Sequence, residues 1–128
     1  MTTREIVVDV PRALWLSSNQ RLHWRSEADR VQGLRSLGLV TGRNARVALG
    51  RTLVTAHIGY PPNVSKADPE NAHPTTKALI DGFTDAEIWP DDDSRYVVSG
   101  GHRRDEGSGK PGWYRVRFEL EAIGGRAL

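Results

Sequence analysis

The sequence contains no cysteine among its 128 residues. This absence excludes a disulfide scaffold, a thiolate zinc site and a cysteine nucleophile, and it suits a reducing compartment. No run approaches the roughly 20 apolar residues that a membrane-spanning helix needs. The N-terminal segment carries charges at Arg4, Glu5 and Asp9, where a signal peptide would be apolar. We therefore expect a soluble, cytoplasmic protein with no membrane partner.

Several common enzyme signatures are also missing. The chain has no GxSxG, P-loop or GxGxxG motif, so the usual hydrolase and nucleotide-binding signatures are absent. The four histidines lack the regular spacing of a zinc site, and His57 falls within a predicted strand, where a structural role is expected. With 38% hydrophobic residues and four tryptophans, the chain suits one compact domain.

The charge of the chain is unevenly distributed, although its net value is only +2. Residues 1–66 carry a net charge of +6, residues 67–94 carry −7 and residues 95–128 carry +3. The acidic segment is either a solvated loop or a group of carboxylates gathered for a cation within a surface that attracts a polyanion. Fifteen of the eighteen basic residues are arginine, which suits bidentate phosphate contacts but would also follow from a GC-rich genome.

Alternating hydrophobic segments predict four strands, and two segments with helical spacing lie between them. The order β-α-β-α-β-β, with the last two strands as a hairpin, favours a single α+β domain over residues 1–128. This domain would have a small mixed sheet and two main helices. The predicted segments are strand 4–10, a helix that begins near Leu22, strand 51–60, helix 74–83, strand 95–103 and strand 113–123.

The two predicted helices differ in their sequence signals. Pro74 is well placed as the first residue of the second helix, which is expected to stop near Gly82. In the first helix, glycines are expected to weaken the C-terminal end. Its apolar positions are Leu22, Val31, Leu34 and Leu37, and the weakening glycines are Gly38 and Gly42.

The strongest candidate site begins at Asp68-Pro69-Glu70. Pro69 favours an extended conformation at Asp68, and residues i and i+2 of an extended chain point to the same side. Asp68 and Glu70 would then converge, and their hard oxygen atoms suit Mg²⁺. A third carboxylate from residues 91–93, three consecutive aspartates, would complete the site if the intervening helix folds back. The alternative is that residues 91–93 form a turn and the acid pair is solvated.

Lys77 is the one basic residue of the acidic segment. It lies one turn into the second predicted helix, where its ammonium group could contact a scissile phosphate or stabilise developing charge. The alternative is a surface ion pair with Asp81 at i,i+4 spacing, which contributes little to stability. Both roles are compatible with each other.

A second candidate site lies where the polar segment after the first strand meets the first helix. Polar, cationic and aromatic side chains alternate there, a mixture that fits phosphate contacts and base stacking. The alternative is that Trp24 belongs to the core and the arginines are ordinary solvated helix residues. The candidate DNA-binding residues are Asn19, Arg21, His23, Trp24 and Arg25.

Together these motifs resemble the RusA family of Holliday junction resolvases. The resemblance covers nearly the whole chain, including the predicted closing hairpin. It rests most heavily on D-P-E-N-A-H-P-T-T-K-A-L-I-D-G at residues 68–82 and W-P-D-D-D at residues 89–93, and less on S-N-Q-R-L-H-W-R at residues 18–25. The resemblance implies a homodimeric endonuclease of mixed α/β fold that cuts four-way DNA junctions with Mg²⁺, for which Mn²⁺ can substitute, in recombination and repair.

The resemblance also implies residue roles. The acid pair falls on Asp68 and Glu70, the lysine on Lys77 and the downstream aspartate on Asp91 or Asp92, with Asp92 favoured. Two departures bear on metal affinity and rate. The second acid is glutamate where the best-known pattern has aspartate, and the segment from residue 71 to residue 77 is three residues longer than the compact pattern.

Two other functions remain compatible with these residues. One is a protein that binds branched DNA through the same surface but has an impaired or lost nuclease site. The other is a small cation-binding protein unrelated to DNA. Junction binding without cleavage would favour the former, and the absence of DNA binding would favour the latter.

Overall fold

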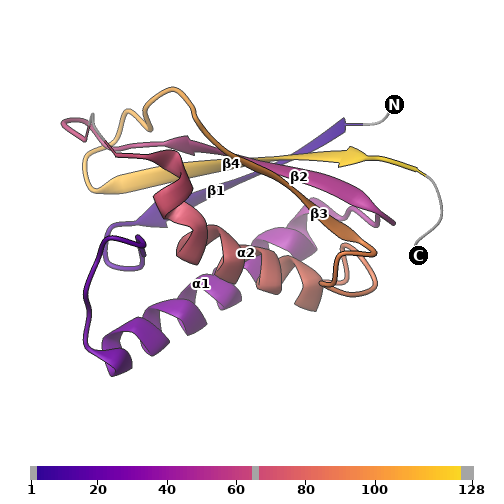
Figure 1. The fold of residues 1–128 in the computed structure, drawn as a ribbon, viewed down its shortest axis with the longest axis horizontal. Coiled ribbons are helices and arrows are strands. Elements are labelled where there is room, and N and C mark those ends of the chain that lie inside the picture. Colours follow the sequence, from indigo (N-terminus) through magenta and orange to yellow (C-terminus); the bar gives the residue numbers. More distant parts are fainter. Residues whose placement is uncertain (1–2, 65–66, 125–128) are drawn as a thin grey trace.

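The computed structural model describes residues 3–64 and 67–124. Within these residues the chain forms an α+β fold with one mixed sheet and two main helices, as the sequence predicts (Figure 1). Both helices cover the same face of the sheet. The elements are β1 (Thr3–Pro11), α1 (Trp24–Ala45), β2 (Thr52–Gly59), the 3₁₀ helix η1 (Pro69–Ala72), α2 (His73–Asp85), β3 (Val97–Arg104) and β4 (Trp113–Ala122).

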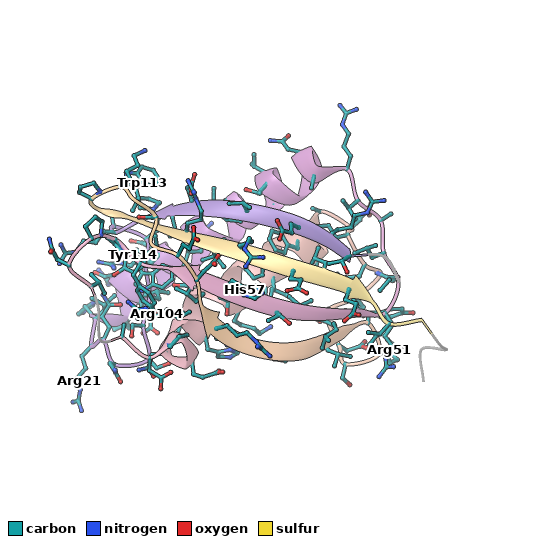
Figure 2. The ribbon with its side chains drawn as sticks, turned by 90° about the horizontal axis from the view of Figure 1, so that it is seen from above. Arg21, Arg51, His57, Arg104, Trp113 and Tyr114 are labelled. Atoms are coloured by element: carbon teal, nitrogen blue, oxygen red, sulfur yellow. The ribbon has the colours of Figure 1, made fainter. Side chains whose placement is uncertain are left out.

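The core lies between the sheet and the two helices. Alternate residues of β4 and β1 are buried beneath the helices, among them Val116, Phe118 and Val8. The opposite face of the sheet carries charged side chains and is seen face-on in Figure 2. None of the helices in the described part of the chain is long and apolar enough to cross a membrane.

The predicted hairpin between the last two strands is wrong. The strand order is β1-β4-β2-β3, so β4 lies between β1 and β2 and pairs antiparallel with both. Strand β3 instead pairs parallel with β2, to which α2 connects it. The strictly alternating β4 occupies a position where both of its edges are paired, whereas β3, with two glycines and a polar end, takes the sheet edge.

The glycines of α1 do not end the helix, because α1 continues through Gly38 and Gly42 to Ala45. Its partner α2 likewise continues past Gly82. A Cβ atom at Gly38 would overlap the backbone carbonyl of Leu79, and one at Gly82 would overlap the backbone of α1. These glycines therefore allow the two helix backbones to approach closely, and this packing outweighs their low helix propensity.

The predicted apolar face of α1 is only partly buried. Leu34 is fully buried, and Leu22 and Leu37 pack against the core from partly buried positions. Val31, however, is exposed on the surface of the helix. Leu22 precedes the helix, which begins at Trp24, so its predicted place on the helix face is wrong. Gly38, rather than a large apolar side chain, lies at a close contact with α2.

Candidate functional site

The acid pair Asp68 and Glu70 lies at the start of η1. Asp68 is extended, with φ −79° and ψ 122°, as Pro69 predicts. Its Oδ1 accepts a hydrogen bond of 3.0 Å from the backbone N–H of Glu70 and so caps the 3₁₀ helix. The chain is therefore not extended through Glu70, and the expected same-side geometry of the pair is wrong. With three residues per turn, side chains two positions apart point in clearly different directions.

Glu70 contacts the sheet edge instead. Its Oε1 accepts a 3.1 Å hydrogen bond from the backbone N–H of His102 on β3, and its Oε2 lies 3.1 Å from His102 Nδ1. The backbone hydrogen bond from His102, supported by the imidazole contact, lowers the pKa of Glu70. Glu70 thus remains an anion and connects η1 to β3.

A hydrogen-bonded chain continues from Glu70 into the protein. The His102 side chain is only 8% exposed, and its Nε2 lies 2.7 Å from Oγ1 of the buried Thr76 on α2. Thr76 Oγ1 in turn donates to the backbone carbonyl of His73 at 3.2 Å. Sequence reasoning missed this chain, because neither the spacing of His102 nor that of Thr76 indicates that β3 and α2 meet here.

A cavity of about 200 Å³ lies between α2, β2 and β3; we call it the α2–β3 cavity. Lys77 and Asp92 both line it. Lys77 Nζ lies 2.7 Å from Asp81 Oδ1 and 4.0 Å from Asp92 Oδ2. The i,i+4 pair predicted for Lys77 is therefore present, and the same ammonium group also approaches the downstream aspartate.

The three aspartates of residues 91–93 have different surroundings. Asp93 forms a double contact with Arg95, at 2.6 and 2.9 Å, and these hydrogen bonds lower the pKa of Asp93. Asp91 accepts a 2.8 Å hydrogen bond from the backbone N–H of Asp92. Of the three, Asp92 is the one that lines the α2–β3 cavity.

Asp68 lines a different and larger hollow of about 560 Å³. We call this hollow the aromatic groove, and Asn19 from the second candidate site also lines it. The remaining lining residues are Arg12, Trp15, Ser17, Gln20, Tyr60, Val64, Ala67, Asn71, Ala72 and Tyr114. Asp68 and Asp92 thus line different hollows, and Glu70 and Asp91 line neither of these two. Residues 3–64 and 67–124 contain no group of three acids or histidines that could hold a metal.

The other candidate DNA-binding residues lie at the exposed start of α1. His23 caps the helix by accepting a 3.2 Å hydrogen bond from the backbone N–H of Arg25. Trp24 is 67% exposed, so the interpretation that it belongs to the core is wrong. The Arg25 guanidinium group lies 5.1 Å from the centre of the Trp24 ring, and Arg21 is also exposed.

Comparison with models of known protein families gives no match, and comparison with curated proteins gives none either.

Proposed function

We propose that this protein is a metal-dependent endonuclease that cleaves branched DNA, with four-way junctions as its substrate. The observation that carries the proposal is the approach of Lys77 to Asp92 at the α2–β3 cavity. A cation and a carboxylate that are 15 positions apart in the sequence approach each other there. Lys77 directly follows Thr76, the buried end of the Thr76–His102–Glu70 chain. The sequence resemblance to RusA resolvases supports the same reaction.

The carboxylates of Asp68, Glu70 and Asp92 offer the hard oxygen atoms that Mg²⁺ prefers. Within residues 3–64 and 67–124 they do not form a group of three that could hold a metal, so the metal dependence in this proposal rests on the sequence resemblance to RusA resolvases. Asp91 is the alternative to Asp92. A bound Mg²⁺, or Mn²⁺ in its place, would supply Lewis-acid activation of water and charge stabilisation at the phosphate. A cation at Glu70 would compete with the hydrogen bonds from His102 that this carboxylate now accepts.

Two side chains of α2 would assist phosphodiester hydrolysis. Lys77 is 54% exposed at its side chain, so its ammonium group can reach a phosphate and neutralise negative charge that grows in the transition state. Asp81 keeps this ammonium group in place on the surface of α2. Symmetric cleavage of a four-way junction needs two such sites, and a two-fold homodimer would provide them.

A second function is favoured by one specific observation. Both oxygen atoms of Glu70 already accept hydrogen bonds from His102, so this carboxylate has a structural role that needs no metal. A protein that binds branched DNA without cutting it would keep this arrangement. Both functions require binding of branched DNA, but only the nuclease cleaves it.

The deciding experiment incubates the purified protein with a labelled four-way junction, with EDTA, Mg²⁺ or Mn²⁺, beside a linear duplex of the same sequence. We expect symmetric cleavage of the junction with either metal and none of the duplex. Lys77→Met should reduce the rate by about 10²- to 10³-fold, whereas Lys110→Met, which removes an exposed lysine outside both hollows, should leave it unchanged. Metal-independent binding without cleavage would support the second function instead.

A further inference from the structure

The aromatic groove has walls that the fold holds in place. The polypeptide between β1 and α1 forms one wall, and backbone hydrogen bonds attach it to η1 and to the loop before β4, from Ser18 N to Asn71 O and from Arg12 N to Gly112 O, each 2.9 Å. Deeper in the wall, Leu16 N donates to Thr75 Oγ1 at 2.8 Å. The groove therefore exists before any ligand binds.

One side of the groove is aromatic. The rings of Trp15 and Tyr114 stack with centroids 3.8 Å apart and nearly parallel planes, and Tyr60 contacts Tyr114 edge-on. The Arg104 guanidinium group lies 4.5 Å from the centre of the Tyr60 ring, and Figure 2 shows Arg104 and Tyr114 at the same end of the sheet. Trp15 and Tyr60 are 7% and 5% exposed, so the partly exposed Tyr114 is the most accessible of the three rings. An aromatic ring held in this way suits contact with a heteroaromatic base.

The polar groups of the groove have few partners. Within residues 3–64 and 67–124, no side-chain hydrogen bond is formed by the Arg12 guanidinium, the side-chain amides of Asn19 and Asn71, or the hydroxyl groups of Tyr60 and Tyr114. Burial raises the pKa of both tyrosines, and nearby guanidinium groups partly oppose this rise, Arg104 at Tyr60 and Arg12 at Tyr114.

We propose that the aromatic groove binds one unpaired nucleotide of a DNA strand, with its base against the wall of Trp15, Tyr60 and Tyr114 and its phosphate at Arg12. The amides of Asn19 and Asn71 would bond the edge of the base. This inference rests on the proposed function for its choice of DNA as the partner. It adds that the protein distinguishes branched from continuous DNA by accepting a base that has left the helix.

The dimensions and surroundings of the groove favour this occupant. About 560 Å³ lies in the range of pockets that hold small organic ligands and accommodates a single nucleotide. Two smaller hollows adjoin it at the loop of residues 61–64. One shares Arg12, Val64 and Tyr114 with the groove and the other shares Tyr60 and Val64, so a strand can continue beyond the bound base. Asp68 lies in the same groove, which would bring the neighbouring phosphate close to a proposed catalytic carboxylate.

The test measures binding in EDTA, so that it does not depend on cleavage. Fluorescently labelled duplexes of equal length are compared, one fully paired and one with a three-nucleotide single-stranded gap, with thymidine monophosphate as a free-nucleotide competitor. We expect the gapped duplex to bind at least about fivefold more tightly, since contact of a base with aromatic side chains commonly contributes about 5- to 100-fold in affinity. Millimolar nucleotide should compete only weakly.

Matched variants test whether the preference for the gapped duplex depends on residues of the aromatic groove. Arg12→Ala should weaken binding of the gapped duplex at least fivefold more than Arg51→Ala, which removes the same charge. Arg51 lies at the opposite end of the sheet from Tyr114 of the groove (Figure 2). Asn19→Ala, an exposed substitution, should weaken binding of the gapped duplex more than binding of the paired duplex, and so reduce the preference for the gap.

Three results would overturn the proposal: equal affinity for gapped and paired duplexes, equal effects of Arg12→Ala and Arg51→Ala, or free nucleotide that binds as tightly as gapped DNA. The proposed nuclease function can fail separately. Gap-selective binding without cleavage of junctions in Mg²⁺ would retain the groove and remove the nuclease, and cleavage without gap preference would do the reverse.

Discussion

The aromatic groove and the α2–β3 cavity differ in the residues that line them. The aromatic groove combines three ring systems with amides and an arginine, and Asp68 is its carboxylate. The α2–β3 cavity is smaller, and Lys77, Asp92 and His102 line it. The two acids of the short motif therefore have separate surroundings, because Asp68 lines the groove whereas Glu70 accepts a hydrogen bond from His102, which lines the α2–β3 cavity.

The largest effect is expected where the packing of α1 against α2 is disturbed. A methyl group at Gly82 would overlap the backbone of α1, so Gly82→Ala should force the helices apart and lower the free energy of unfolding by about 3 kcal/mol or more. Urea denaturation measures this change. Gly50→Ala is the control, because a Cβ atom there meets nothing within 4 Å. Equal stabilities of the two variants would contradict the close approach of α1 and α2.

The next largest effect is expected at Asp68, the acidic residue that lines the aromatic groove. Asp68→Asn should reduce Mg²⁺-dependent junction cleavage at least about a hundredfold, with junction binding kept or tightened because a negative charge is removed. Asparagine is a good helix-capping residue, so η1 should stay folded. Asp29→Asn, which removes an exposed carboxylate from α1, is the control for charge alone. A wild-type cleavage rate in Asp68→Asn would remove this residue from the site.

Glu70 allows the metal and the His102 contact to be separated. Glu70→Asp keeps the carboxylate but is too short to maintain both bonds to His102, so we expect retained cleavage and a melting temperature lower by a few degrees. Glu70→Gln keeps the shape but loses the charge, so cleavage should fall at least about tenfold while the melting temperature changes less. Cleavage assays and thermal denaturation are run on both variants. The opposite pattern, active Gln and inactive Asp, would make Glu70 a purely structural residue.

These contrasts also show which parts of the structure the sequence could predict. The four strands and both helices follow from hydrophobic periodicity, which is local. The pairing of β4 between β1 and β2 is not local, since it depends on which strand best satisfies two neighbours. From the sequence alone, Gly38 and Gly82 are expected to weaken or end their helices. Their role in close helix packing depends on the position of the opposite helix.

The sequence also predicts only part of the candidate site. The approach of Asp92 to Lys77 follows from the interpretation that the chain folds back after α2. The separation of Asp68 from Glu70 could not be predicted in this way. Pro69 correctly predicts an extended conformation at Asp68, but the extended chain ends one residue later, where η1 begins. His102 could not be found at all, since only the parallel pairing of β3 with β2 brings it to Glu70.

A smaller effect concerns the exposed start of α1. If Arg21 and Arg25 contact phosphates of duplex arms, each alanine substitution should make the slope of log affinity against log salt shallower by about one unit. Junction binding across a salt series measures the slope. Arg43→Ala, at the other end of the same helix, should leave it unchanged. Slopes that do not change in either variant would remove this segment from the DNA surface.

The smallest effect is expected on the open face of the sheet, away from both hollows. Arg117 Nε donates a 3.0 Å hydrogen bond to Asp105, and its Nη1 lies 2.7 Å from Glu5 Oε2. The hydrogen bond from Arg117 holds the pKa of Asp105 below its ordinary value of 3.8. Because the folded state lowers this pKa, the pair contributes stability above pH 3.8 and loses it as the pH falls through the folded-state pKa.

Arg117→Met keeps much of the aliphatic stem and removes the charge. Its free energy of unfolding should be lower than that of the wild type by about 1 kcal/mol at pH 7, and the difference should shrink on acidification below pH 4. Denaturation at several pH values measures this, with Arg115→Met as the control, since its ion pair with Asp9 is more exposed and should contribute less. Junction affinity and its salt slope should be unchanged in both variants. A marked loss of affinity in Arg117→Met would instead place the open face of the sheet, rather than the surfaces beside η1, against DNA.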